Sequence, residues 1–462
     1  MATSKRVGGA ASQRYDLTQG DIFRKLLFVS LPVMAGQFMI MAYTLADIFW
    51  LGMLSSDAVV ASSTAGMFLW MSMGLMLMVR IGTEIGVSQN VGLGNLDAAR
   101  GYSQAGLWMA LALGVAFGSF MIFARVPLVS FFNIPNDQVV LDAQLYLAIS
   151  GFSIPFMYAS GVIAGSFAGY GNTRLPFVVQ CTGLVANIVL DPILIFGAGL
   201  GVAGAAYATI IARLIEFGLF VLAIKKHKNR PYESFSMLAK PGRKEARDIF
   251  RWGFPVAVET MVMSSFGMII ARMVAVWGVA PMAAQRVAFQ IEALSWLVGA
   301  GFGSAMTAFV GQNFGAGKWS RIHKGFKTAL ASMSIWGLLV SVFIFIFAEP
   351  LIGLFLREPE EIVLGGVLLR ILAVSQIPQS IEGAMAACFR GRGVTFKPSI
   401  VSIACNSSRV VLAYILSTTP LGLFGIWWAV TIGAAMRGTI MLLWFLWDRR
   451  KLPREDLVTS HV

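Results

Sequence analysis

Charged side chains are scarce in this chain, and their scarcity excludes a water-soluble fold. Only 13% of the 462 residues are Asp, Glu, Lys or Arg, whereas 57% are hydrophobic and the mean hydropathy is +0.73. A soluble domain carries roughly 25% charged residues. Most of the surface of this chain must therefore face lipid, and we expect an integral membrane protein.

Cysteine is also rare, and complete nucleotide-binding motifs are missing. Cys181, Cys388 and Cys405 lie in or beside apolar segments without CxxC spacing, which is typical of small buried side chains. A glycine-rich loop has Gln312 and Trp319 where a phosphate-binding loop needs Gly and Ser or Thr. No nucleophile–base pair or metal-ligand cluster is visible. We therefore expect no enzyme and no cofactor, and the energy for any transport must come from an ion gradient.

The net charge of +13 does not indicate nucleic-acid binding, because the basic residues stand in clusters between apolar runs. One cluster lies within 225–230, whereas alternate connections such as 55–56 and 278–280 have no Lys or Arg. Basic loops face the cytoplasm. Both termini and the central linker are thus expected to be cytoplasmic. Residues 1–25 contain no apolar stretch, so we expect no cleaved signal peptide and a bacterial or archaeal inner (plasma) membrane.

About twelve apolar runs are long enough for a bilayer span, which takes roughly 20 residues. They cover residues 26–54, 58–89, 100–124, 139–169, 175–197, 201–224, 249–277, 281–312, 323–347, 362–389, 399–417 and 422–446. An all-α polytopic membrane protein is therefore expected.

The two halves of the chain form an internal repeat. QNVGLG at 89–94 recurs as QNFGAG at 312–317, a shift of 223, and GYGNT at 169–173 recurs as GRGVT at 391–395, a shift of 222. Each half holds six spans, an even number, which predicts two bundles related by a parallel pseudo-two-fold repeat. The expected parts are a tail at 1–25, an N-terminal lobe at 26–224, a linker at 225–248, a C-terminal lobe at 249–446 and a tail at 447–462.

Ionisable residues inside spans mark a candidate coupling site, since each costs about 2.5–3.5 kcal/mol to insert. Asp47, Asp191 and Thr209 all lie roughly 10–12 Å from the outer ends of their spans. Tyr43 and Asn187 lie one helical turn inward of the two aspartates. Such oxygens suit Na⁺, and two close carboxylates also suit a proton. Structural capping or pairing of the aspartates is the alternative.

The C-terminal lobe lacks this arrangement, because Ile270 and Ala413 stand at the positions that match Asp47 and Asp191. Coupling is therefore predicted for the N-terminal lobe. The C-terminal lobe supplies candidates for a substrate cleft that accepts flat organic cations, namely Glu259, Gln290, Glu292, Trp296 and Glu382. For each acid, an interhelical pair with an arginine is the alternative, the candidates being Arg272, Arg286, Arg370 and Arg409.

Taken together, these motifs resemble the multidrug and toxic compound extrusion (MATE) family, in particular its DinF-like prokaryotic branch. The similarity is carried by LP at 31–32, YTLAD at 43–47, GYGNT at 169–173, NIVLDP at 187–192, GAAYAT at 204–209 and QNFGAG at 312–317. It covers essentially the whole chain. One departure is Arg392, a basic residue in the second-half turn.

The resemblance implies about twelve helices in two six-helix bundles around a V-shaped central cleft. It implies alternating-access export of cationic, amphipathic drug-like compounds in exchange for Na⁺ or H⁺. It also implies an ion site at Asp47, Asn187, Asp191 and Thr209, with Tyr43 beside it. A flippase for a lipid-linked saccharide, a channel and a non-transporting scaffold remain alternatives. No motif marks an oligomer interface, and we expect a monomer.

Overall fold

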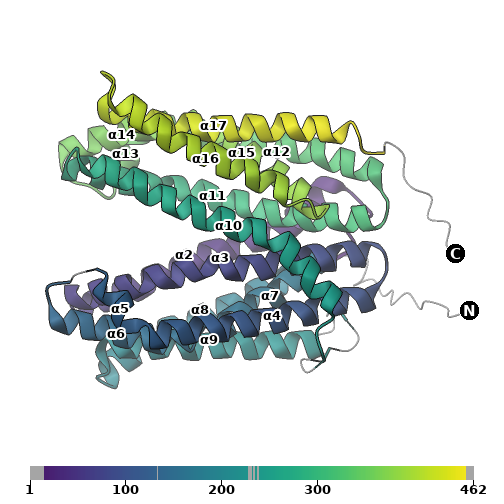
Figure 1. Ribbon diagram of the computed structural model, residues 1–462, viewed down its shortest axis with the longest axis horizontal. Helices are drawn as coiled ribbons and strands as arrows, with labels where there is room; N and C mark the ends of the chain where they lie inside the picture. The colour runs from purple at the N-terminus through teal and green to yellow at the C-terminus, as the bar shows by residue number, and fades with distance from the viewer. Residues whose placement is uncertain (1–14, 133, 227–230, 233–234, 237–238, 454–462) are drawn as a thin grey trace, which may run out of the picture. The chain divides into compact units, whose positions relative to one another are not determined.

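The computed structural model describes residues 15–132, 134–226, 231–232, 235–236 and 239–453 (Figure 1). Parts of the predicted tails and linker, at 1–14, 227–230, 233–234, 237–238 and 454–462, lie outside the described residues. In the part that is described, ten single helices are long and apolar enough to cross a membrane, and two bent pairs raise the count to twelve. The predicted polytopic all-α fold is thereby confirmed.

The spans follow one another with short connections. The ten single helices are α2 (Ile22–Leu54), α3 (Ser56–Gly92), α4 (Leu96–Phe123), α8 (Arg174–Pro192, continued to Gly197 by the π-helical turn η1), α9 (Gly201–Lys226), α10 (Arg243–Ala275), α11 (Val279–Gly315), α12 (Trp319–Ile346), α16 (Phe396–Ser417) and α17 (Gly422–Arg449). The bent pairs are α6 (Asp137–Gly151) with α7 (Ile154–Tyr170), and α14 (Pro359–Ala373) with α15 (Gln376–Gly391). Two short helices, α5 (Arg125–Ser130) and α13 (Ala348–Gly353), precede the pairs.

Local sequence signals set the ends of several helices. The Ser55 hydroxyl accepts a 3.0 Å hydrogen bond from the Ala58 N–H at the start of α3, and the Asn95 side chain does the same for Ala98 in α4. Both residues satisfy N–H groups that have no partner within the helix. Gly171 ends α7 with φ of 96°, a left-handed conformation that strains other residues.

Both bent pairs break at matching positions of the repeat. The bends are 46° between α6 and α7 and 50° between α14 and α15. The hydroxyls of Ser153 and Ser375 each bond a carbonyl of the preceding turn, at 2.7 and 2.9 Å. Gly114 and Gly337 lie against these breaks, where an added methyl group would come within 2.6 to 2.8 Å of backbone atoms. The two halves of the repeat therefore also pack a glycine and a serine in the same way at each helix break.

Contacts between Cα atoms divide the chain into two units. Unit 1 comprises residues 1–19 and 31–254, and unit 2 comprises residues 20–30 and 255–462. The first turns of α10 belong to unit 1 because Asp248 accepts a 2.8 Å hydrogen bond from the Tyr102 hydroxyl and Trp252 stacks on the Tyr102 ring. Whether the lobes at 26–224 and 249–446 act as separate functional units stays a prediction.

The described part of the linker docks on unit 1. Tyr232 is only 3% exposed, exchanges a 2.5 Å hydrogen bond with Ser103 and donates to the Ala99 carbonyl. Burial raises the pKa of the Tyr232 phenol, so this side chain stays protonated and able to donate. Trp108 of α4 bonds the Ala239 carbonyl at 2.9 Å. The linker is therefore held along α4 at these points.

Candidate ion and substrate site

The residue at the centre of the predicted ion site, Asp191, lies where a helix changes its winding. Pro192 has no N–H to donate, so the α-helical ladder of α8 is interrupted beside Asp191. The chain continues as the π-helical turn η1 (Ile193–Gly197), which closes with a 2.8 Å bond from Ala198 N to Ile193 O. Such turns occur frequently at functional sites. Asp191 itself is 0% exposed.

Asp47 and Asp191 form a pair of acids, and Asn187 is the amide that contacts them. Asn187 Nδ2 donates to Asp191 Oδ1 at 3.2 Å, and Asn187 is also fully buried. The Asp47 carboxyl, on α2, interacts with both Asp191 and Asn187. Two carboxylates in one buried site repel each other unless a cation or a proton lies between them.

Tyr43 and Thr209 adjoin the same acids from α2 and α9. The side chains of Tyr43 and Thr209 interact with each other, and Tyr43 also lies close to Asp47. The Arg213 guanidinium lies 5.0 Å above the centre of the Tyr43 ring. The structure thus brings together all five residues that the depth argument selected, although their role in coupling stays a prediction.

Each of these five residues has a buried polar atom with no hydrogen-bond partner among the described residues. The atoms are Tyr43 Oη, Asp47 Oδ1, Asn187 Oδ1, Asp191 Oδ2 and Thr209 Oγ1. Buried polar groups are nearly always paired, because an unpaired one costs about 1–3 kcal/mol. Oxygens of neighbouring residues that lack hydrogen-bond partners suit a small cation such as Na⁺, or a proton shared by the carboxylates.

Tyr146 is a further member of the site that sequence reasoning missed. It lies on α6, is 5% exposed and interacts with Asp47, Asp191 and Thr209. Tyr146 stands nine residues from the start of α6 at Asp137, or roughly 13 Å deep. The depth argument would therefore have found it if uncharged tyrosines of every span had been included.

A cavity of about 100 Å³ in unit 1 adjoins this site. Its lining includes four methionines and several polar residues: Met39, Met73, Met76, Met157, Tyr43, Arg80, Gln180, Arg213 and Glu216. Arg213 and Glu216 form a 2.7 Å ion pair. Methionine side chains adapt to varied apolar shapes. The cavity therefore combines an adaptable apolar wall with charged groups next to the aspartates.

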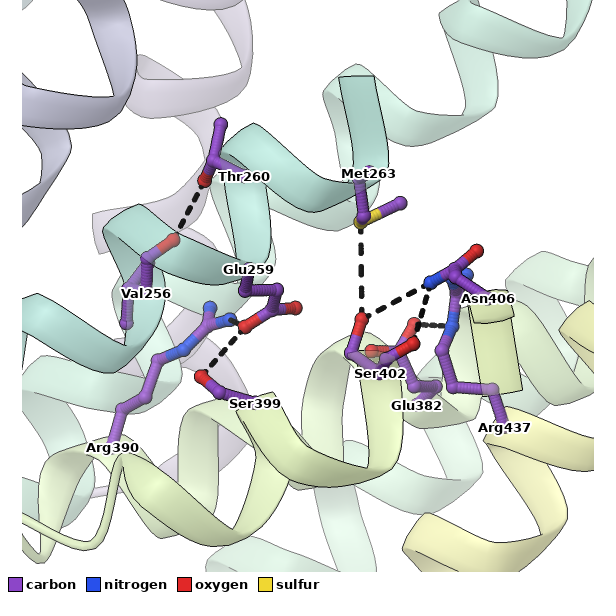
Figure 2. A network of polar contacts seen from close by, with 10 residues as sticks. All are labelled: Val256, Glu259, Thr260, Met263, Glu382, Arg390, Ser399, Ser402, Asn406 and Arg437. Atoms are coloured by element: carbon purple, nitrogen blue, oxygen red, sulfur yellow. Dashed lines mark hydrogen bonds and ion pairs between the residues drawn. The ribbon is translucent and has the colours of Figure 1, made fainter. Parts of the chain in front are cut away.

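The predicted acids of unit 2 are paired. The Ser399 hydroxyl donates to Glu259 Oε2 at 2.8 Å, and the Arg390 guanidinium lies 4.0 Å from the same oxygen (Figure 2). The Arg437 Nε atom lies 3.2 Å from Glu382 Oε2 (Figure 2). For these two acids the structure shows interhelical pairing with an arginine, but the partners are Arg390 and Arg437 and not the four arginines named as the alternative.

Glu292 is held mainly by amides. Gln376 Nε2 donates to Glu292 Oε1 at 3.3 Å. With the Gln379 amide turned so that its nitrogen faces the same oxygen, it donates there at 3.3 Å and accepts from the Trp296 indole. Gln290 is exposed on α11. The substrate candidates of unit 2 therefore do not form one group, since Glu292 and Trp296 meet at the α14–α15 break and Glu259 lies against α16.

Comparison with known proteins supports the architecture. A sequence model of the MatE family matches residues 32–193 and 255–415, which is well over half of the chain. The chain belongs to the MATE family. The two matched segments correspond to the two halves of the internal repeat. MATE proteins are membrane transporters rather than enzymes, so this chain is a multi-pass membrane protein of a transporter family.

Several MATE relatives match over nearly their full length. The probable multidrug resistance protein NorM of Thermotoga maritima is 28% identical over 452 residues, 95% of this chain and 96% of that protein. The multidrug export protein MepA of Staphylococcus aureus is 21% identical and covers 96% and 99% of the two chains. A crystal structure of MATE in the bent conformation superposes with a TM-score of 0.89 at 24% identity, covering 96% and 98%. A MOP superfamily transporter from Pyrococcus furiosus gives 0.88 with the same identity and coverage. The MATE fold is thereby established.

Proposed function

We propose that this MATE protein is a secondary active antiporter that exports cationic, amphipathic drug-like compounds in exchange for Na⁺ or H⁺. The observation that carries the proposal is the set of five buried oxygens without partners at Tyr43, Asp47, Asn187, Asp191 and Thr209. The names of NorM and MepA, a multidrug resistance and a multidrug export protein, support the class of substrate. The protein would act as a monomer in a plasma membrane, with both termini in the cytoplasm.

Charge balance supports competition between the coupling ion and a cationic substrate. Asp47, Asp191 and Glu216 supply three negative charges at the site and its cavity, and Arg80 and Arg213 supply two positive ones. The net charge is therefore −1 when all three acids are ionised. One bound Na⁺ or proton brings it to zero, which removes the attraction for a cation in the adjoining cavity.

The exchange cycle follows from this competition. With the aspartates free, the cavity lined by Met39, Met73, Met76 and Met157 binds an amphipathic cation. Binding of the ion at Asp47 and Asp191 neutralises the site, alters α2, α8 and α9, and releases the substrate. Alternating access of the two units converts this competition into transport, because ion and substrate are then bound in different states.

The test is efflux of a fluorescent cationic dye from proteoliposomes under an imposed Na⁺ or pH gradient. Asp47→Asn is expected to lower gradient-driven efflux at least 100-fold, because a neutral amide neither binds nor releases the ion in the same way. The matched control is Asp97→Asn, which removes a carboxylate from an 87% exposed side chain of the same unit. Uphill efflux that survives in folded Asp47→Asn protein would exclude coupling at this site.

A lipid-linked saccharide is the second candidate substrate, and one observation favours it. Arg80 lines the cavity and makes no ion pair within 4.0 Å among the described residues, so it could receive a phosphate group. In the same liposomes, dye that moves under neither gradient, combined with transfer of a lipid-linked pyrophosphate, would establish flipping instead of antiport.

A further inference from the structure

Unit 1 holds an ion pair between the predicted ion site and the methionine-lined cavity. Arg213 and Glu216 lie three residues apart on α9, and Arg213 Nη1 donates to Glu216 Oε2 at 2.7 Å. The Glu216 side chain is only 6% exposed, and that of Arg213 is 24% exposed. Both residues line the cavity of about 100 Å³ together with Tyr43. A buried ion pair is by itself weak evidence for stabilisation, so its place beside a cavity points to a function.

The position of Arg213 on α9 places it between two groups of acids. Thr209 of the ion site lies one helical turn before Arg213 and Glu216 lies almost one turn after it, so the three share one face of α9. Side chains of a helix lean toward its N-terminus, which directs the Arg213 side chain toward the turn of Thr209. The Arg213 guanidinium lies 5.0 Å above the centre of the Tyr43 ring and interacts electrostatically with Asp47. Arg213 thus bonds one acid while it lies near another.

Arg213 has donors to spare, and the ion site has matching acceptors. A guanidinium carries five N–H groups, and among the described residues the single hydrogen bond of Arg213 is the one to Glu216. Asp47 Oδ1 and Asp191 Oδ2 are buried acceptors that have no partner in the described part of the chain. Arginine and carboxylate groups match each other in geometry and form strong hydrogen bonds. The same guanidinium therefore suits both Glu216 and the two aspartates.

The second half of the internal repeat lacks this pair. The GVAG motif that begins α9 recurs as GLFG at the start of α17, a shift of 221. At this shift Ala434 stands at the position of Arg213, and Arg437 stands at that of Glu216. The helix is therefore built in unit 2 without the pair, as unit 2 is built without the two aspartates. The pair and the acids of the ion site occur together in one unit, which indicates a shared role.

The charges of the cavity show what such a role requires. The lining residues include Arg80, Arg213 and Glu216, which together give a net charge of +1. This charge repels a cationic compound as long as Arg213 stays bonded to Glu216. When the guanidinium turns to the aspartates, the net charge of the lining falls to zero and the Glu216 carboxylate is exposed to the cavity. Binding of a cation is therefore linked to the departure of Arg213.

We propose that Glu216 binds the cationic group of the exported compound, and that Arg213 then moves from Glu216 to Asp47 and Asp191. Arg213 is a tethered cation that occupies the two aspartates in place of Na⁺ or a proton. Return of the ion to the aspartates sends Arg213 back to Glu216 and releases the compound. The inference rests on the proposed antiport function and deepens it, because it supplies the contact by which a compound in the cavity expels the ion.

The test is a double-mutant cycle on the Kd of rhodamine ethyl ester, a flat cationic dye. Fluorescence anisotropy of the purified full-length protein, in a mildly alkaline buffer without Na⁺, gives this Kd. Arg213→Gln frees Glu216 of its competitor, so the Kd is expected to fall about tenfold. Asp47→Asn removes an acceptor for the moving guanidinium, so the Kd is expected to rise about tenfold. In an Arg213→Gln background Asp47→Asn is expected to change the Kd by less than about twofold, because no guanidinium has to move.

Three further variants separate this exchange from a structural role. Arg213→Lys keeps a cation on the same helix and should restore the dependence of the Kd on Asp47. Glu216→Gln should raise the Kd about tenfold and also abolish that dependence, and it serves the test if Arg213→Gln does not fold. Arg100→Gln is the matched control, because it opens an exposed i,i+3 pair with Asp97 in the same unit and should change neither the Kd nor the effect of Asp47→Asn.

Two results would overturn the proposal. An effect of Asp47→Asn that keeps its size in the Arg213→Gln and Glu216→Gln backgrounds would show that the aspartates attract the dye directly. A Kd that changes neither in Arg213→Gln nor in Glu216→Gln would leave this ion pair a structural one. Failure of the antiport proposal is read from efflux under an ion gradient, and failure of this one is read from binding at equilibrium, so the two are distinguishable.

Discussion

Units 1 and 2 share one fold, yet the same two positions carry buried acids in unit 1 and apolar residues in unit 2. Unit 1 places Asp47 and Asp191 in a buried site with unpaired oxygens. Unit 2 places Ile270 and Ala413 there, 2% and 0% exposed, within one apolar cluster that also contains Trp427. The fold does not need the acids, since its second copy is built without them. Buried acids present in only one copy therefore indicate a function of that copy.

The cytoplasmic ends predicted for the two units differ in a similar way. Unit 1 has an exposed i,i+3 ion pair between Arg100 and Asp97. Unit 2 has a buried group in which Asp448 accepts from Arg392 at 2.8 Å and from Lys397. The Arg392 side chain is only 5% exposed. The departure from the family pattern at Arg392 is therefore compensated within unit 2 by an acid near the end of α17.

The largest effect on stability is expected when an acid of the unit 1 site is introduced at the matching position of unit 2. Ile270→Asp puts a carboxylate into the apolar cluster without a partner, which should lower the unfolding free energy by about 3–5 kcal/mol. Denaturant titration of the purified protein in mixed micelles measures this. Asp47→Asn, which removes a negative charge from a site with unpartnered oxygens, is expected to change stability by less than about 1 kcal/mol. Similar losses for both changes would contradict the contrast between the units.

A smaller effect is expected at the buried ion group of unit 2. Asp448→Ala leaves the buried Arg392 without an acidic partner and should cost about 3 kcal/mol. Asp97→Ala, in the exposed pair of unit 1, should cost less than about 1 kcal/mol. The same titration compares the two variants. Equal costs would show that burial does not determine how much these two ion pairs contribute to stability.

The smallest difference between the units is expected at their matching glycines. Gly114→Ala and Gly337→Ala each push a methyl group against the start of a broken helix, at 2.6 Å from Pro155 and 2.8 Å from Gln376. Overpacking of this kind costs about 1–3 kcal/mol. Thermal unfolding of the two variants should give nearly the same loss. A large difference would show that the two breaks are packed less alike than the repeat indicates.

Hydropathy and depth along the helices predicted much of this molecule. The twelve apolar runs correspond to the ten single spans and two bent pairs, because a helix of fixed rise needs a fixed length of apolar sequence. Depth also brought Asp47, Asp191 and Thr209 to one level, and the structure joins them. Depth specifies only the height along a helix. It does not specify which side chains turn toward each other, so Tyr146 and the methionine cavity were not predicted.

The sequence by itself determined that this is a membrane protein of two repeated six-span halves, and that acids lie at one depth in the first half. These conclusions need only composition, periodicity and the rise of a helix. Only the tertiary structure decided which polar groups are satisfied. It pairs Glu259 and Glu382 with arginines, and among the described residues it leaves five oxygens around Asp47 without hydrogen-bond partners. Pairing depends on how helices distant in sequence pack side by side, and spacing along one chain does not contain that information.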